Sequence, residues 1–249
     1  MNILFTTQSD SLHLFNELSK ALSSRTDVSR VGFTIADSAA YGRWSVTNSD
    51  FETGNHILVK EWEVTRVRAG RPNLDKLAAY ERKLGVEAGL FGAVVADRRL
   101  FMGPDCTYTQ DYRRRFSDDE LLIILEQGLE ATERLFDELK PDLMVGFICV
   151  TMLEYLAYLF ARARGVRIMN LRSTRIGDRV AFGSTLNDPS PEFAAAYERL
   201  RAGGSSLHGE AARDYLRNVR EKHARYEGVV RPSDKPALTI NATRKSPFT

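Results

Sequence analysis

The feature that most constrains the fold is a strand–helix–strand succession in the middle of the chain. The stretch "PDLMVGFICV" (141–150) is nearly continuously apolar, "TMLEYLAYLFARARG" (151–165) has helical spacing, and "VRIMNL" (166–171) is apolar again. Strands that are joined through a helix run parallel, and parallel strands that are buried on both faces have continuous apolar runs. The succession therefore predicts an α/β fold, a parallel sheet with helices on both faces and right-handed crossovers.

The first forty residues repeat this pattern. "NILFTT" opens an apolar run at residue 2, "SLHLFNELSKALSS" follows with helical spacing, and "RVGFTIAD" (30–37) is apolar again, which completes a βαβ unit. A third extended stretch, "HILVKEWEVTRV" (56–67), is rich in β-branched and aromatic residues but also carries charges. Because charged strands are favoured at sheet edges, we expect 56–67 to form an edge strand.

Capping residues mark two further helices and the start of the helix at 151–165. Gly85 follows "NLDKLAAYERKL" (73–84) as a helix C-cap. Ser117 with Glu120, and Thr151 with Glu154, have the Ser/Thr-x-x-Glu spacing of a capping box. The helix after Ser117 presents one apolar face and ends at Pro141, whereas the layout of residues 86–116 does not follow from the sequence. The apolar face comprises Leu121, Leu125, Leu129, Thr132, Phe136 and Leu139.

The last sixty residues change in character. "SPEFAAAYERLRA" (190–202) and "GEAARDYLRNVREKHARYEG" (209–228) are helical and polar, and "ALTINA" (237–242) has the pattern of one more strand. The predicted organisation is a Rossmann-like domain at 1–188, a helical extension at 189–235, and a linker or the start of a further domain at 236–249.

Composition and motif content exclude several function classes. A formal net charge of +2 over 249 residues gives no overall field that would favour nucleic acid. Cys106 and Cys149 lack CxxC or metal-ligand spacing, which indicates reduced thiols in a cytoplasmic protein. We expect no transmembrane segment and no resident cofactor or metal, while peripheral membrane association stays open. The absence of Walker, GxGxxG, HExxH and GxSxG motifs argues against phosphate-loop NTPases, dehydrogenases, zincins and hydrolases.

Polar clusters follow three of the predicted strands. They are "TTQSD" (6–10), "TMLE" (151–154) and "RSTRIGDR" (172–179). In an open parallel sheet, ligands bind beyond the carboxyl ends of the strands, so we expect these clusters to line one cleft.

Each cluster also has a structural interpretation. Ser9, Asp10 or Ser11 can cap the first helix, and the capping box accounts for both Thr151 and Glu154. The arginine-rich stretch 172–179 fits either a salt-bridged surface loop or an anion site, because arginines grip phosphate and carboxylate through paired hydrogen bonds. Both alternatives stay open.

The chain resembles the N-terminal half of bacterial capsule and surface-polysaccharide biosynthesis proteins, which are similar to glycosyltransferases of the GT-B type. The resemblance rests on "MNILFTTQSD", on "YERKLG" followed by "ADRRL", on "KPDLMVGF", and on "RGVRIMNLRSTRIGDR" leading into "NDPSPEF". It implies two Rossmann-like domains that face a cleft, with the glycan acceptor on the N-terminal domain and the nucleotide sugar on the C-terminal one. The expected partners are therefore a nucleotide sugar, as co-substrate, and a glycan acceptor.

The resemblance also implies roles for individual residues. Asp10 and Asp178 become candidate general bases for an acceptor hydroxyl. Glu81, Asp97 and Arg98 match the family pattern without a role that the sequence explains. The implied substrate-binding residues are Thr7, Gln8, Ser9, Arg172, Ser173, Arg175 and Arg179.

The sequence departs from the family pattern where a second α/β domain is expected, after residue 249. We therefore expect this chain to fold but not to transfer a sugar by itself. Two alternatives remain: a non-catalytic carbohydrate- or anion-binding module or partner subunit, and an enzyme similar to nucleotide-sugar epimerases.

Overall fold

The computed structural model describes residues 1–8, 11–48, 56–86, 89–101, 115–147, 149–174, 176, 179–186 and 190–221. The chain divides into two compact units. The first comprises Met1–Arg172 with Phe182–Pro191, and the second comprises Ser173–Ala181 with the chain from Glu192 onward.

A six-stranded sheet in the order β3-β2-β1-β4-β5-β6 organises the first unit. The pairs β3–β2, β2–β1, β1–β4 and β4–β5 are all parallel, which confirms the predicted α/β class and parallel sheet. The order of the first five strands is that of the Rossmann fold, and it reverses direction between β1 and β4. The strands are β1 (Asn2–Thr7), β2 (Arg30–Ile35), β3 (His56–Lys60), β4 (Leu143–Gly146), β5 (Arg167–Ser173) and β6 (Val180–Gly183).

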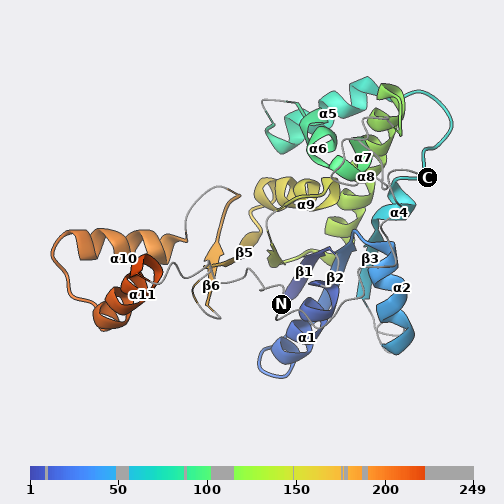
Figure 1. Cartoon of the computed structure of the whole chain (residues 1–249). Coiled ribbons are helices and arrows are strands. Elements are labelled where there is room, and N and C mark those ends of the chain that lie inside the picture. Colours follow the sequence, from blue (N-terminus) through green and yellow to red (C-terminus); the bar gives the residue numbers. More distant parts are fainter. Residues whose placement is uncertain are drawn as a thin grey trace, which may run out of the picture. The chain divides into compact units, whose positions relative to one another are not determined.

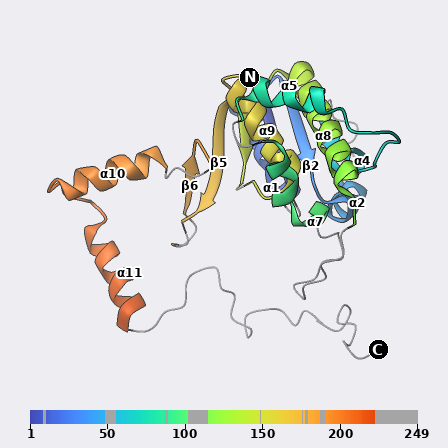
Figure 2. The same ribbon diagram turned by 90° about the horizontal axis from the view of Figure 1, so that it is seen from above.

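Helices cover both faces of this sheet (Figure 1 and Figure 2). Phe5, Phe15 and Phe33 belong to a buried cluster on the face of α1 and α2. Leu4 and Met144 belong to a second cluster on the face of α8 and α9, to which α5 and α6 also contribute. The helices of this unit are α1 (Ser11–Ser23), α2 (Ser38–Thr47), α4 (Glu61–Val64), α5 (Leu74–Leu84), α6 (Phe91–Ala96), α7 (Arg98–Phe101), α8 (Asp118–Leu139) and α9 (Met152–Ala163).

The predicted caps are confirmed. Both reciprocal hydrogen bonds of the capping box are present at Ser117, which starts α8, and at Thr151, which starts α9. Gly85 ends α5 with a φ of 63°, a left-handed conformation that glycine adopts without steric cost.

The extended prediction for 56–67 is correct only in its first part. β3 is indeed an edge strand among the described strands, but it ends at Lys60, and Glu61–Val64 forms the short helix α4. At this point the Glu61 carboxylate is buried and bound by Arg99 of α7. Two short helices, α6 and α7, occupy part of the region whose layout the sequence did not predict.

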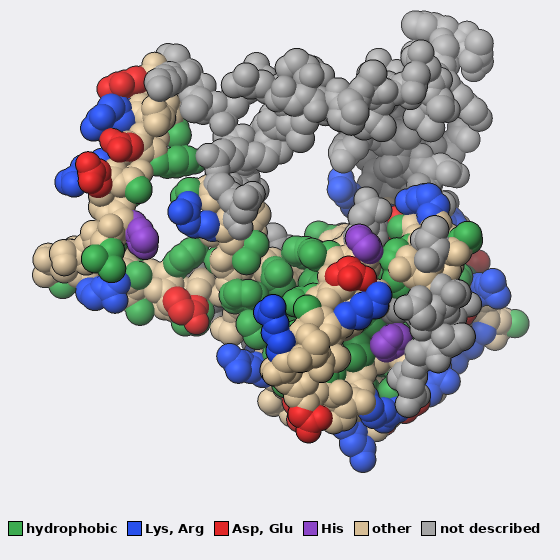
Figure 3. All heavy atoms as spheres, turned by 90° about the horizontal axis from the view of Figure 1, so that it is seen from below, with side chains coloured by type: hydrophobic (Ala, Val, Ile, Leu, Met, Phe, Trp, Pro, Cys, Tyr) green, Lys and Arg blue, Asp and Glu red, His purple; other side chains and the backbone are tan. Residues whose placement is uncertain are grey.

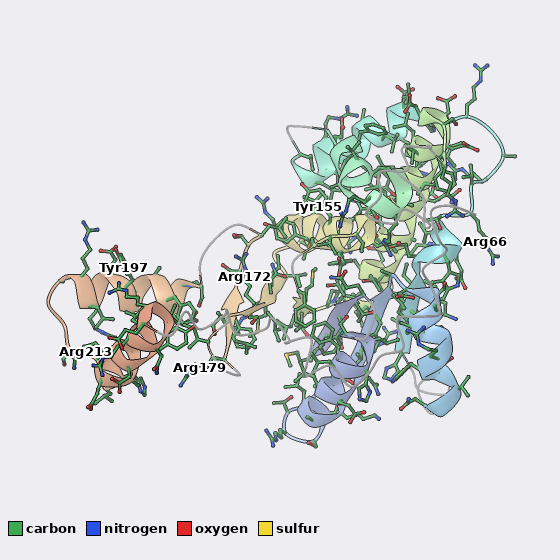
Figure 4. The ribbon with its side chains drawn as sticks, viewed as in Figure 1. Arg66, Tyr155, Arg172, Arg179, Tyr197 and Arg213 are labelled. Carbon is green, nitrogen blue, oxygen red and sulfur yellow. The ribbon has the colours of Figure 1, made fainter. Side chains whose placement is uncertain are left out.

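The second unit contains most of α10 (Pro191–Arg201) and all of α11 (Gly209–Glu221), which confirms that 190–202 and 209–221 are helical. Neither helix buries a residue, and Phe193, Tyr197 and Leu216 are exposed. Figure 3 shows hydrophobic side chains beside charged ones on these helices, and Figure 4 labels Tyr197 and Arg213. The strand predicted at 237–242 lies outside the described residues.

Candidate functional site

The candidate site lies at the carboxyl ends of β1, β2 and β4, beside the point where the strand order reverses. Open α/β sheets bind ligands at this position because the connections after two neighbouring strands diverge to opposite faces. Helix α9 begins directly after β4, so its N-terminus faces the same edge.

Two carboxylates of the protein itself occupy the N-terminus of α9. Glu154 Oε2 accepts hydrogen bonds from the backbone N–H groups of Val150, at 3.0 Å, and Thr151, at 3.1 Å. Asp97 Oδ2 accepts from the backbone N–H of Met152 at 3.0 Å. The positive end of a helix commonly binds a ligand anion, but here these donors are already used.

Arg99 links this helix terminus to the strand ends. Its Nη2 donates to Asp97 Oδ2 at 2.9 Å and to Glu61 Oε1 at 2.5 Å, and its Nη1 donates to the Ala36 carbonyl, just after β2, at 2.9 Å. The Arg99 side chain is 40% exposed, whereas the side chains of Glu61 and Asp97 are 6% and 1% exposed. One partly exposed guanidinium thus covers a buried acidic cluster, Glu61, Asp97 and Glu154.

The acidic cluster carries more negative charge than Arg99 balances. Burial raises the pKa of Glu61 to about 8; Arg99 opposes this rise, and the charges of Asp97 and Glu154 add to it. Burial also raises the pKa of Glu154, against the opposing N–H groups of Val150 and Thr151. A carboxyl with a pKa near 8 is mostly protonated at neutral pH and can exchange its proton close to that pH, as an acid–base residue requires.

Several buried polar atoms at this edge have no hydrogen-bond partner. Among the described residues they include Glu61 Oε2, Glu154 Oε1, Thr34 Oγ1 near the end of β2, and Asn170 Oδ1 and Arg172 Nε on β5. Leaving such an atom unpaired costs about 1–3 kcal/mol, so their concentration at one edge calls for an explanation. Three of the five are carboxyl or amide oxygens: Asn170 Oδ1 only accepts hydrogen bonds, whereas Glu61 Oε2 and Glu154 Oε1 only accept them when the carboxyl is ionised.

The backbone register aligns some of these atoms. Gly146 of β4 pairs with Asn170 of β5, and a Cβ at Gly146 would lie 2.2 Å from Thr6 Oγ1 and 3.9 Å from Asn170 Oδ1. Thr6 in turn pairs with Thr34. Thr34, Thr6 and Asn170 therefore form a polar row across the sheet, interrupted only by a glycine that has no side chain.

The residues predicted after β1 are partly described. Thr7 is fully buried, and its hydroxyl donates to the Thr34 carbonyl at 2.8 Å. Gln8 is half-buried at the carboxyl end of β1, and its backbone N–H donates to Ser11 Oγ at 2.8 Å. Ser9 and Asp10 lie outside the described residues.

The substrate-binding residues predicted at and after the end of β5 belong to different units. Arg172 is half-buried in the first unit, while Ser173 and Arg179 are exposed in the second. The Arg179 carbonyl accepts from the N–H and the hydroxyl of Thr174, at 3.2 and 2.9 Å. Arg175 and Asp178 lie outside the described residues.

The sequence does not predict Glu61 or Arg99 as site residues, and it predicts only a capping role for Glu154. Of the family-pattern residues without a role, Asp97 proves central to the cluster, whereas Glu81 Oε1 accepts from the Leu90 N–H at 2.9 Å and Arg98 is exposed. Asp97, an acidic residue in a stretch without a predicted layout, was the sequence feature that could have indicated this cluster.

Cys149 lies next to this edge but does not supply a nucleophile. Burial raises the pKa of its thiol to about 12, so the reactive thiolate is not populated at neutral pH. Cys106 lies outside the described residues.

In comparisons with protein-family models, with curated proteins and with solved structures, no match to this chain was found. Within the described ranges, none of the helices has the length and apolar character needed to cross a membrane. No group of three or more potential metal ligands occurs among the residues that the structure describes.

Proposed function

We propose that this chain is the acceptor-binding α/β domain of a sugar transferase in bacterial surface-polysaccharide synthesis, with a nucleotide-activated sugar as co-substrate. The observation that carries the proposal is the presence of buried, unpartnered carboxyl and amide oxygens toward the carboxyl ends of the strands, Glu61 Oε2 after β3, Glu154 Oε1 at the start of α9 and Asn170 Oδ1 on β5. A saccharide presents several hydroxyl donors to such a set, and each hydroxyl can also accept in return. The resemblance to capsule biosynthesis proteins supplies the reaction class.

Glu61 is the described residue best suited to act on an acceptor hydroxyl. In the transfer, the hydroxyl oxygen bonds to the anomeric carbon of the donor, the nucleotide phosphate leaves, and the hydroxyl proton passes to a base. Glu61 has one oxygen held by Arg99 and the other without a partner, so it can take this proton in its ionised form. Asp10 and Asp178 remain alternative bases by sequence alone.

The second candidate is a carbohydrate-binding module without catalysis. The observation in its favour is that Asp97 and Glu154 are tied to the start of α9 by backbone hydrogen bonds, an arrangement that suits rigid recognition. In this alternative the buried acids orient hydroxyl groups and no proton is transferred.

The test incubates the chain with a panel of nucleotide sugars and neutral oligosaccharide acceptors and measures nucleotide release. Glu61→Gln removes the proposed base, and Glu63→Gln is the matched control because Glu63 is exposed on the same short helix. Because the resemblance places the nucleotide sugar on a second domain, the chain alone should bind a saccharide acceptor without releasing nucleotide, and Glu61→Gln, but not Glu63→Gln, should weaken this binding. Acceptor-dependent release by the chain alone would show that the donor site also lies here, and the absence of saccharide binding contradicts the site.

A further inference from the structure

Arg172 on β5 is held by backbone carbonyl groups and has no charged partner among the described residues. Its Nη2 donates to the carbonyls of Thr185, at 2.9 Å, and Leu186, at 2.5 Å. Its guanidinium lies against Gly183, where an added Cβ would be 3.1 Å from Nε. Two carbonyls and a glycine thus pin this side chain, which Figure 4 labels.

The charge of Arg172 is not neutralised within the described part of the chain. No carboxylate among the described residues forms an ion pair with Arg172, and its Nε is buried without a hydrogen-bond partner. Arg99, by contrast, is paired with both Glu61 and Asp97. A half-buried guanidinium that binds only neutral carbonyls keeps its attraction for an anion.

The N-terminus of α9, which carries partial positive charge, already binds carboxylates of the protein itself. Asp97 and Glu154 already accept from the N–H groups of Val150, Thr151 and Met152 at the start of α9, so these donors are not free for an anionic group of a ligand. Arg172 is therefore one described residue at the carboxyl edge that can receive an anion.

Asn170 adds the second half of a recognition pair. It precedes Arg172 by two positions on the same strand, so both side chains lie on the same face, about 6.6 Å apart along the backbone. Asn170 is 1% exposed and its Oδ1 has no partner, which provides an acceptor beside the guanidinium donors. An anionic substituent next to a hydroxyl group matches this pair.

We infer that Arg172 binds an anionic substituent of the hydroxylated ligand, so that the saccharide recognised at this edge is an acidic one bearing a carboxylate or a phosphate. This inference rests on the proposed function, because it assigns the substrate class of the same site. Arg172 contacts the anion, and Asn170 Oδ1 accepts from a neighbouring hydroxyl.

The experiment titrates the ¹⁵N-labelled chain with D-glucose, D-glucuronate and D-glucose 6-phosphate while following backbone amides and the Nε–H signal of Arg172. We expect at least one acidic sugar to bind about 10- to 100-fold more tightly than glucose, the range that charge-assisted hydrogen bonds provide. Its binding should shift the Arg172 Nε–H signal, and the two acidic sugars distinguish carboxylate from phosphate. Arg172→Gln should remove the preference and leave weak glucose binding, whereas Arg167→Gln, at an exposed position at the other end of β5, should keep it.

The outcomes separate this inference from the proposed function. Equal affinities for glucose and both acidic sugars in the wild type overturn the acidic class and leave a neutral saccharide site in place. A preference for the acidic sugars that survives in Arg172→Gln overturns the role of Arg172. The absence of binding by all three sugars contradicts both proposals. If Arg172→Gln does not fold, Arg172→Lys replaces it, because Lys keeps the charge but lacks the planar guanidinium donors. A weaker preference for the acidic sugars in Arg172→Lys, with a shifted Nε–H signal in the wild type, supports the inference, and an unchanged preference with an unshifted signal overturns it.

Discussion

The Asp97 carboxylate accepts a hydrogen bond from the backbone N–H of Met152 at 3.0 Å, across 55 positions of sequence. The same oxygen accepts from Arg99 Nη2 at 2.9 Å, so one buried atom joins α7 to the start of α9. In many α/β proteins the corresponding helix terminus binds a ligand anion. Here an internal carboxylate takes that place, so the proposed ligand site relies on the neighbouring acids and on β5.

Replacing Asp97 with Ala should strongly destabilise the first unit. The change removes the acceptor of the Met152 N–H and of Arg99. We expect the free energy of unfolding to fall by about 2–4 kcal/mol. This loss is smaller than that for breaking a fully buried ion pair, because Arg99 still has Glu61 as a partner. Urea unfolding measures it. Arg98→Ala, at the exposed neighbouring position, is the control and should stay within about 0.5 kcal/mol of the wild type. Equal values for the two variants would show that the Asp97 contacts do not stabilise the fold.

Glu61 should make stability fall as the pH rises. Its pKa in the folded protein, about 8, lies above the ordinary value of 4.5, so the folded state holds the proton more tightly than the unfolded state. The stabilisation is complete below the ordinary pKa and is lost as the pH rises through the folded pKa. Between pH 5.5 and 8, the wild type should lose up to about 1.4 kcal/mol per pH unit relative to Glu61→Gln. Urea unfolding of both proteins across this range tests the prediction, and parallel curves would contradict it.

The parts of the fold that depend on neighbouring residues were predictable from the sequence. Each capping box spans four consecutive residues, such as 117–120, and the left-handed Gly85 acts within one helix turn. The parallel sheet followed from alternating apolar runs, because hydrophobic periodicity reports local burial.

The acidic cluster could not be predicted because tertiary contacts create it. Arg99 reaches Glu61 across 38 positions, and no local pattern states that these two residues meet. The extended prediction for 56–67 failed after Lys60, where the short helix α4 begins with Glu61, the residue of this long-range ion pair. Thr151 and Glu154 were recognised as a cap, but their position beside Asp97 required the three-dimensional structure.

Thr151→Ala should affect stability but not ligand affinity. Its hydroxyl accepts from the Glu154 N–H at 3.3 Å, and loss of a helix cap costs about 0.5–2 kcal/mol. Ser117→Ala, which removes the same kind of cap from α8, is the matched control and should have a similar cost. Thermal unfolding and saccharide titration measure the two effects. Weakened binding by Thr151→Ala with an unchanged melting temperature would show that Thr151 contacts ligand directly.

Replacing either of two glycines with alanine should change the free energy of unfolding, in opposite directions at the two positions. At Gly146 a Cβ would lie 2.2 Å from Thr6 Oγ1 within the sheet, so Gly146→Ala should cost about 1–3 kcal/mol. At Gly42, inside α2, a Cβ meets nothing within 4 Å, so Gly42→Ala should stabilise the protein by up to about 1 kcal/mol. Chemical denaturation compares both variants with the wild type. A neutral Gly146→Ala would mean that the polar row has room for a side chain.

Mapping the amide shifts that maltose causes in the ¹⁵N-labelled chain shows whether a saccharide binds at the carboxyl ends of β1 and β4. We expect saturable shifts at Gln8, Val150 and Thr151, and Glu61→Gln should weaken the binding whereas Glu63→Gln should not. Amides that remain unchanged at this edge up to high millimolar maltose, or saturable shifts confined to other parts of the chain, would contradict it.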